Sequence, residues 1–139
     1  MPETEGQLPL IPVAAGILVR GGRILICQRH HTDCYGLEWE FPGGKIREDE
    51  SPQAGLRREL EEELGLEAEI GPEVYRLRHR YPDRHVEVAF FRVDGFRGEP
   101  VNRVFESIAW AEPGELAGYK FLAADRDLVQ RLARGEIVS

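Results

Sequence analysis

Apolar residues in the first third of the chain form two runs that predict a β-hairpin. Residues 11–19 are apolar with few breaks, as in a buried strand, and residues 23–29 (RILICQR) form the second run. The pair Gly21-Gly22 lies between them, and a Gly-Gly pair between two apolar runs is typical of a tight turn. We therefore expect two antiparallel strands, followed by a polar loop over residues 30–37.

The spacing of leucines in the next segment predicts a helix. Its apolar positions recur at every fourth residue, as one face of a helix requires: Leu56, Leu60 and Leu64. Ser51 is a favoured N-cap residue, and Pro52 suits the first helical position. Gly65 is a favoured residue just past the end of a helix, so we expect the helix to begin near Ser51 and to end at Gly65.

The second half of the chain predicts further strands and a terminal helix. A strand is expected over residues 67–80, interrupted by Gly71-Pro72, and others over residues 85–93 and 107–110. Residues 124–134 predict a helix, with its inward side chains at Leu128, Val129 and Leu132. The order strands, helix, strands, helix predicts an α+β fold with a mixed sheet sandwiched between helices.

Length and composition fit one globular domain. The chain has 139 residues, of which 42% are hydrophobic, and this is enough to fill a core. No repeat, linker or low-complexity stretch divides it. We expect a short lead-in over residues 1–10 and a single domain over residues 11–139.

The charge balance limits the classes of partner. Acidic residues outnumber basic ones, 25 to 18, which gives a net charge of -7 and argues against a nucleic-acid partner. No apolar run approaches a membrane span, and acids stand where a signal peptide would carry bases. Cys27 and Cys34 form no Cys-x-x-Cys pair, which favours free thiols in a reducing compartment. We expect a cytoplasmic protein without a membrane partner, either a monomer or a homodimer.

Three carboxylates of the predicted helix point to metal chemistry. Glu59, Glu62 and Glu63 are three and four residues apart, so they share one face of the helix, separate from the leucine face. Mg²⁺ prefers a few carboxylates, water and substrate phosphates, and a bound cation relieves the repulsion between the acids. A solvated helix face is the alternative. Arg58 lies within a turn of Glu62 and is placed to orient a neighbouring carboxylate.

The spacing of fixed residues around these acids decides between the two interpretations. Gly44, five residues, Glu50, seven residues, Arg58-Glu59-Leu60, one residue, Glu62-Glu63, one residue and Gly65-Leu66 match every fixed position of the pattern G-x5-E-x7-R-E-U-x-E-E-x-G-U, in which U is apolar. This pattern is the Nudix box. The chain therefore resembles the Nudix hydrolases, and more narrowly the MutT-type nucleoside triphosphate pyrophosphohydrolases. The stretch from Trp39 to Lys45 before the box (WEFPGGK) supports the likeness.

The resemblance implies a fold, a reaction and a set of roles. The fold would be the Nudix α/β/α sandwich, and the reaction would convert a nucleoside triphosphate and water to the monophosphate and pyrophosphate. The cofactor would be Mg²⁺, which Mn²⁺ is able to replace. The implied catalytic residues are Glu59, Arg58, Glu62 and Glu50. The implied metal ligands are Glu59, Glu62, Glu63 and the carbonyl of Gly43. Glu59 would be either a ligand or the general base, Arg58 would orient it, and Glu50 would support the metal through water.

The resemblance fails at one position. MutT-type enzymes often carry a further acid before the tryptophan of the last strand, and the matching residue here is Val104, which has no ligand atom. Glu106 lies two residues on. It is either a substitute metal ligand or an ordinary surface acid.

Six residues are candidates for contact with the nucleotide. They are Arg29, Gly44, Lys45, Tyr81, Arg84 and Asp125. Asp125 stands where the 8-oxo-dGTP-specific prototype of the family has an asparagine. An ionised Asp only accepts hydrogen bonds, which suits the N7–H of 8-oxoguanine and also the exocyclic amine of cytosine or adenine, but it would repel guanine O6. The alternative role for Asp125 is a helix cap.

The resemblance leaves several functions open. We expect an enzyme that removes oxidised nucleotides such as 8-oxo-dGTP; the alternatives are a cytosine-nucleotide pyrophosphohydrolase acting on CTP or a modified dCTP, a hydrolase of ADP-ribose or dinucleoside polyphosphates, and a non-catalytic ligand sensor. A soft-metal site at His30, His31, Asp33 and Cys34 is disfavoured, because the spacing matches no established ligand pattern.

Overall fold

The computed structural model describes residues 8–137 of the chain. Its larger sheet is mixed and runs in the order β3-β2-β1-β7-β6, with β4 paired to β1 and β9 paired to β2. The strands are β1 (Leu10–Arg20), β2 (Arg23–Gln28), β3 (Trp39–Glu40), β4 (Gly43–Lys45), β6 (Glu73–Tyr81), β7 (Arg84–Val93) and β9 (Ser107–Ala111). A small second sheet pairs β5 (Glu67–Glu69) with β8 (Gly95–Arg97).

One parallel pair of strands makes the sheet mixed. β1 and β7 run in the same direction from Leu10 opposite His85 to Leu18 opposite Val93, and the other pairings are antiparallel. The predicted hairpin is confirmed, since Val19 pairs with Ile24 and Arg20 with Arg23 around the turn glycines. β1 begins at Leu10, opposite His85 of β7, one residue before the predicted strand; residues 1–7 of the predicted lead-in lie outside the described residues.

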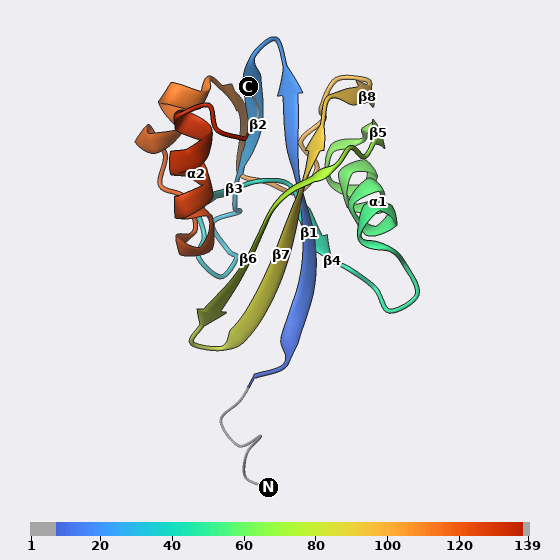
Figure 1. Cartoon of the computed structure of the whole chain (residues 1–139), viewed down its shortest axis with the longest axis vertical. Coiled ribbons are helices and arrows are strands. Elements are labelled where there is room, and N and C mark those ends of the chain that lie inside the picture. The colour runs from blue at the N-terminus through green and yellow to red at the C-terminus, as the bar shows by residue number, and fades with distance from the viewer. Residues whose placement is uncertain (1–7, 138–139) are drawn as a thin grey trace, which may run out of the picture.

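The sheet lies between two helices, as the element order predicted (Figure 1). Helix α1 (Pro52–Leu64) covers one face, and helix α2 (Arg126–Ala133), with the 3-10 helices η2 (Pro113–Gly118) and η3 (Ala123–Asp125), covers the other. The alternation of strand side chains divides the core accordingly. Ile17 packs on the α2 side, whereas its neighbour Leu18 packs on the α1 side.

Helix α1 has the boundaries that its sequence predicted. The Ser51 side chain accepts a hydrogen bond from the Ala54 N–H at 3.1 Å, and Gly65 adopts a left-handed conformation with φ 67°. The leucine stripe is fully buried: Leu56, Leu60 and Leu64. Burial of each of these side chains contributes about 1.5–3 kcal/mol to the stability of the fold. The leucine stripe therefore holds one face of the helix against the sheet and fixes which face is turned away from it.

Three details differ from the sequence prediction. The strand expected over residues 67–80 divides between two sheets, because Pro72 has no N–H and Gly71 turns its N–H to the Arg92 carbonyl at 2.9 Å. The terminal helix begins at Arg126, after the tighter turn η3. Strands β4 and β8 were not predicted, since three residues carry too little pattern. None of the helices in residues 8–137 is long and apolar enough to cross a membrane.

Candidate active site

Arg58, on the charged face of α1, forms ion pairs with three acids. Its guanidinium donates to both carboxylate oxygens of Glu50, at 2.6 and 3.1 Å, and to the Lys45 carbonyl at 3.2 Å. It also contacts Glu62 at 3.3 Å and Glu59 at 3.4 Å. One cation therefore holds three acids of the segment, and the predicted role of Arg58 in orienting Glu59 agrees with this geometry.

Glu50, which was predicted to support the metal through water, accepts three hydrogen bonds within the protein. Besides its two bonds from Arg58, it accepts a hydrogen bond from the Arg47 N–H at 2.9 Å. The bonds from Arg58, followed by the one from Arg47, lower the pKa of Glu50 to about 2. Glu50 is thus a permanent anion that fixes the position of the Arg58 side chain.

Glu63 contacts strand β4 of the sheet. Its carboxylate is bound by the Gly43 backbone N–H, and its Oε1 atom is buried without a hydrogen-bond partner. Burial, then repulsion by Glu59 and Glu40, raises the pKa of Glu63 to about 9. A buried carboxylate oxygen with no donor fits a divalent cation, which would supply the missing positive partner.

The backbone before the box approaches the carboxylates closely. A Cβ atom on Gly44 would lie 2.2 Å from Oε2 of Glu59, so only glycine leaves room for that side chain. A Cβ on Gly43 would lie 2.1 Å from the Ala14 carbonyl oxygen, because Gly43 lies directly beside β1 in the antiparallel pair of β4 and β1. Burial also raises the pKa of Glu59. Glu59 and Glu63 thus converge on the glycine strand, although the oxygens of Glu59, Glu62 and Glu63 do not all come within 4.8 Å of one another in the described structure.

A cavity of about 390 Å³ opens beside this strand. All six predicted nucleotide-contacting residues line it, together with two predicted metal-site residues: Arg29, Gly44, Lys45, Tyr81, Arg84, Asp125, Gly43 and Glu63. The remaining lining is largely apolar, from β1 and β7. A concave, mostly apolar pocket with a few converging charges is the usual form of a small-molecule site, and here Glu63 is one of the charged residues that line it.

Comparisons with known proteins identify the family of the chain. The family model of the NUDIX domain matches residues 10–132, which is most of the chain. The chain belongs to the Nudix family. It is 36% identical over 124 residues to a CTP pyrophosphohydrolase of Escherichia coli, covering 88% of this chain and 91% of the relative. It is 37% identical over 125 residues to an 8-oxo-dGTP diphosphatase of Haemophilus influenzae, with the same two coverages.

Solved structures show the same Nudix architecture. The solution structure of the E. coli ORF135 protein superposes with a TM-score of 0.80 at 34% identity, covering 90% of this chain and 89% of that one. A crystal structure of a MutT protein from Methanosarcina mazei Go1 gives a TM-score of 0.84 at 22% identity, covering 93% and 96%. At that identity the second likeness concerns the fold alone. The chain is a Nudix hydrolase with the α+β sandwich of the family, and Nudix hydrolases use a divalent metal and small nucleotide substrates.

The Nudix pocket contains one acid that the sequence reasoning missed. Glu40 lines the cavity and accepts a hydrogen bond from Arg29 at 3.0 Å, with about a fifth of its side chain exposed. Burial raises its pKa, opposed by Arg29, and Glu40 in turn raises the pKa values of Glu63 and Asp125. The available signal was a lone carboxylate between Trp39 and Phe41, just before the glycines.

The two predicted basic contacts are held in different ways. Arg29 is fixed at the cavity wall, because it donates to Glu40 and, at 2.8 Å, to the Cys34 carbonyl. Arg84 lies over the Tyr81 ring at 5.2 Å, and its Nε atom is buried without a hydrogen-bond partner. Arg84 thus lines the cavity with one donor unpaired, whereas Arg29 is already paired with Glu40.

Asp125 is deeply buried in the cavity wall. It is 6% exposed, and burial followed by repulsion from Glu40 raises its pKa to about 8. Its side chain makes no capping hydrogen bond to α2, although it occupies the N-cap position. The structure therefore does not support the helix-cap alternative and leaves the side chain to the cavity.

Glu106, the predicted substitute for the missing Nudix acid, does not line the cavity. Val104 is half exposed and lines the cavity, as its matched position implies, whereas Glu106 is not among the lining residues. Glu106 instead accepts hydrogen bonds from the His31 N–H at 3.0 Å and is 2.8 Å from the His31 ring Nδ1. Its role as a ligand of the box metal stays a prediction.

Proposed function

We propose that the chain is a Mg²⁺-dependent nucleoside triphosphate pyrophosphohydrolase that removes oxidised nucleotides such as 8-oxo-dGTP. One observation carries the proposal: Glu63 belongs to the Nudix box and also lines the cavity. Its buried oxygen has no partner, and the cavity beside it has the size and lining of a small-molecule site. A triphosphate reaching from the cavity toward α1 would bring its oxygens to the cation that Glu63 requires.

The proposed metal ligands are Glu59, Glu62, Glu63 and the Gly43 carbonyl, which offer the hard oxygen atoms that Mg²⁺ and Mn²⁺ prefer. When bound, the metal neutralises charge on the phosphate oxygens and lowers the pKa of water. Arg58 keeps Glu59 and Glu62 in place. Arg84 and Lys45 line the cavity and balance the charge of the triphosphate.

The chemical step transfers a phosphoryl centre to water. The water oxygen forms a bond to one of the two phosphorus atoms of the α–β phosphoanhydride, that anhydride bond breaks, and the leaving group, either pyrophosphate or the nucleoside monophosphate, takes the electron pair. The proton released by water goes to a carboxylate, and a positioned base contributes on the order of 10² to 10⁴ in rate. Glu59 is our candidate for this base where it does not serve as a metal ligand, and burial raises its pKa above the ordinary value of a glutamate.

The protonation state of Asp125 supports the oxidised purine. With a pKa of about 8, its carboxyl is largely protonated at neutral pH and offers one donor and one acceptor. The donor suits guanine O6 and the acceptor suits the N7–H found in 8-oxoguanine. The expected repulsion of O6 by an ionised Asp is thereby removed. The name of the H. influenzae relative, 8-oxo-dGTP diphosphatase, is consistent with this assignment.

A cytosine nucleotide is the second candidate, on a specific observation. When Asp125 is ionised it accepts only, which suits the exocyclic amine of CTP or a modified dCTP, and the E. coli relative is named a CTP pyrophosphohydrolase. Hydrolysis of ADP-ribose or a dinucleoside polyphosphate would release a second phosphorylated organic fragment in place of pyrophosphate. A non-catalytic sensor would bind nucleotide without turnover, which the complete box disfavours.

Product analysis across a nucleotide panel tests the proposal. We expect Mg²⁺-dependent release of pyrophosphate and monophosphate, with the highest kcat/KM for 8-oxo-dGTP among dGTP, dATP, dCTP, CTP, 5-methyl-dCTP and ADP-ribose. A preference for the cytosine nucleotides would replace the oxidised-purine assignment. Absence of pyrophosphate with every triphosphate would overturn the pyrophosphohydrolase assignment itself.

A further inference from the structure

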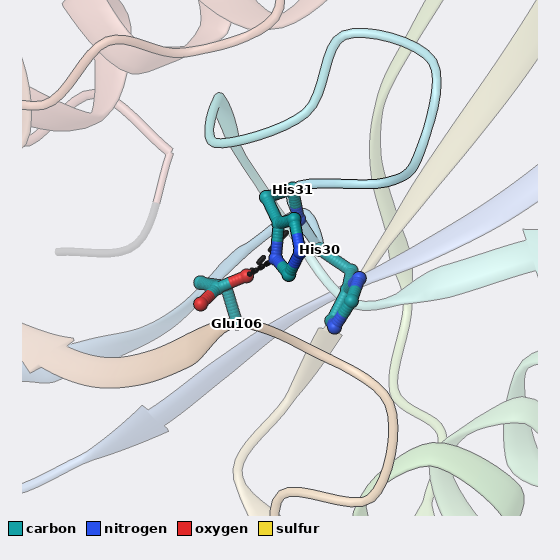
Figure 2. A group of neighbouring side chains, drawn as sticks. All are labelled: His30, His31 and Glu106. Carbon is teal, nitrogen blue, oxygen red and sulfur yellow. Dashed lines mark hydrogen bonds and ion pairs between the residues drawn. The ribbon is translucent and has the colours of Figure 1, made fainter.

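We propose that His30, His31 and Glu106 form a second metal site, separate from the Nudix box, that takes a transition-metal ion such as Zn²⁺. One potential ligand atom from each of the three residues lies within 4.8 Å of the other two. Figure 2 shows the His31 ring against the Glu106 carboxylate, with His30 beside it. Within residues 8–137, no other three His, Cys, Asp or Glu side chains come this close.

The sheet register explains why these residues meet. β2 and β9 are antiparallel neighbours in which Gln28 pairs with Ser107. The two histidines follow the end of β2, and Glu106 directly precedes β9. Both segments therefore lie at the same end of the β2–β9 pair. The Glu106 N–H extends the ladder by donating to the Gln28 carbonyl at 2.9 Å. The backbone that carries the three side chains is therefore fixed by the fold.

The loop after β2 is shaped to hold the histidines. The Asp33 N–H donates to the His30 carbonyl at 2.9 Å, which closes a backbone turn over residues 30–33. A Cβ on Gly36 would lie 2.7 Å from the His31 carbonyl oxygen, so the returning chain passes too close for a larger residue. The Thr32 hydroxyl lies 2.8 Å from His30 Nδ1. The Thr32 N–H also donates to this Nδ1 atom, at 3.3 Å, so a residue of the same loop holds the His30 ring in place.

The ligand types determine which metals fit. Two imidazoles and one carboxylate are typical ligands of Zn²⁺, with bonds of about 2.0–2.2 Å, whereas Mg²⁺ prefers oxygen atoms alone. Around such an ion the ligand atoms would stand roughly 3–4 Å apart. His31 Nδ1 and Glu106 Oε1 are already 2.8 Å apart, and both side chains are partly exposed, at 60% and 35%, so rotation suffices to admit the ion.

The cluster lies next to the cavity but outside its lining. Arg29 and Asp33 on the histidine loop, and Phe105 next to Glu106, line the cavity, while the three cluster residues do not. An ion bound here would tie the loop after β2 to the segment before β9 and stiffen one wall. The inference does not rest on the proposed function, because metal binding is measured without any nucleotide.

Competition with a chromophoric zinc chelator tests the site directly. The full chain is freed of metal and titrated with Zn²⁺ in an excess of Mg²⁺, which occupies the oxygen ligands of the box. We expect one Zn²⁺ per chain in the wild type, and at least tenfold weaker binding in His31→Gln and in Glu106→Gln. His85→Gln is the matched control, since it makes the same chemical change at a histidine outside the cluster, and it should bind as the wild type does.

A second titration with Co²⁺ identifies the ligands by its visible absorption. Imidazole ligation should give the wild type and His85→Gln the same band, and His31→Gln should lose it while keeping the wild-type melting curve. Equal Zn²⁺ affinity in all four proteins would overturn the site. So would a wild type that binds no Zn²⁺ in excess Mg²⁺, in which case His31 and Glu106 are an ordinary ion pair.

Discussion

At the scale of single residues, Asp125 gives the proposed specificity a pH dependence. Its pKa of about 8 means that the donor for guanine O6 is present below about pH 8 and is lost above it. We therefore expect kcat/KM for 8-oxo-dGTP to fall by up to about tenfold per pH unit above that value, because the reactive form becomes scarce. For CTP the same titration should raise kcat/KM, since the ionised form accepts from the amine. Steady-state profiles with both substrates measure the two slopes.

Asp125→Asn is the control for this profile. An amide keeps one donor and one acceptor at every pH, so the break near pH 8 with 8-oxo-dGTP should disappear. A break that persists unchanged in the variant would assign the titration to the substrate or to another residue.

Arg58 also acts as a single residue, through the acids that it holds. Arg58→Gln should release Glu50, Glu59 and Glu62 and lower kcat by about 10–100-fold, as loss of a supporting partner usually does. KM for the nucleotide should change little, because Arg58 does not line the cavity. Arg58→Lys should rescue only part of the rate, since an ammonium lacks the planar fork that binds both oxygens of Glu50.

The neighbouring Arg57 provides the matched control. It is exposed on α1 and contributes no ion pair to the box acids, so Arg57→Gln should keep the wild-type kcat. If Arg58→Gln raised KM and left kcat unchanged, Arg58 would be a binding residue and the positioning role would be wrong.

At the scale of elements, the leucine face of α1 supplies the rigidity that the carboxylate face needs. Leu60 is fully buried in the core between α1 and the sheet. Leu60→Ala should lower the free energy of unfolding by about 2–5 kcal/mol, the usual cost of a cavity at such a site. Glu61→Ala, on the exposed side of the same turn, should cost less than about 0.5 kcal/mol. Urea denaturation of the three proteins checks the difference, and equal midpoints would mean that α1 is not anchored by this stripe.

Elements also show what the sequence was able to predict. Helix α1 was predicted with both ends because leucine spacing, the Ser51 cap and Gly65 are local signals that agree. Strands β4 and β8 escaped prediction because three residues show no period, and their pairing is set by distant partners. Among the candidate site residues, the box acids were predicted from their spacing and stay a prediction, whereas Glu40, which lines the cavity, was not predicted. Its importance comes from facing Arg29, Glu63 and Asp125 across the fold, which no local pattern records.

At the scale of the whole molecule, the sheet brings chemistry from both of its faces to one cavity. Glu63 comes from the helix on one face, and Asp125 from the segment that covers the other face. The parallel pair of β1 and β7 lies between them and provides the apolar wall. Burying several acids in one cavity lowers the stability of the metal-free protein, so any cation that binds at the site should raise that stability.

Divalent metal should therefore stabilise the entire fold through Glu63. Its pKa of about 9 in the fold exceeds the ordinary value of 4.5, so folding takes up a proton between about pH 5 and about pH 9. Without metal, stability should fall as pH rises through this window, by at most about 1.4 kcal/mol per pH unit. A cation that replaces the proton restores stability, so Mg²⁺ should raise Tm more at the upper end of the window than at the lower end.

Thermal melts with excess Mg²⁺ or excess chelator, at both ends of that window, measure this coupling. Glu63→Gln should melt higher than the wild type when metal is absent, because the amide carries no charge to bury, and it should lose most of the Mg²⁺-induced rise in Tm. His31→Gln, outside the box, should keep the full rise. If Glu63→Gln kept it as well, the cation would be held by Glu59 and Glu62 alone, and the unpaired oxygen of Glu63 would belong to the nucleotide side of the cavity.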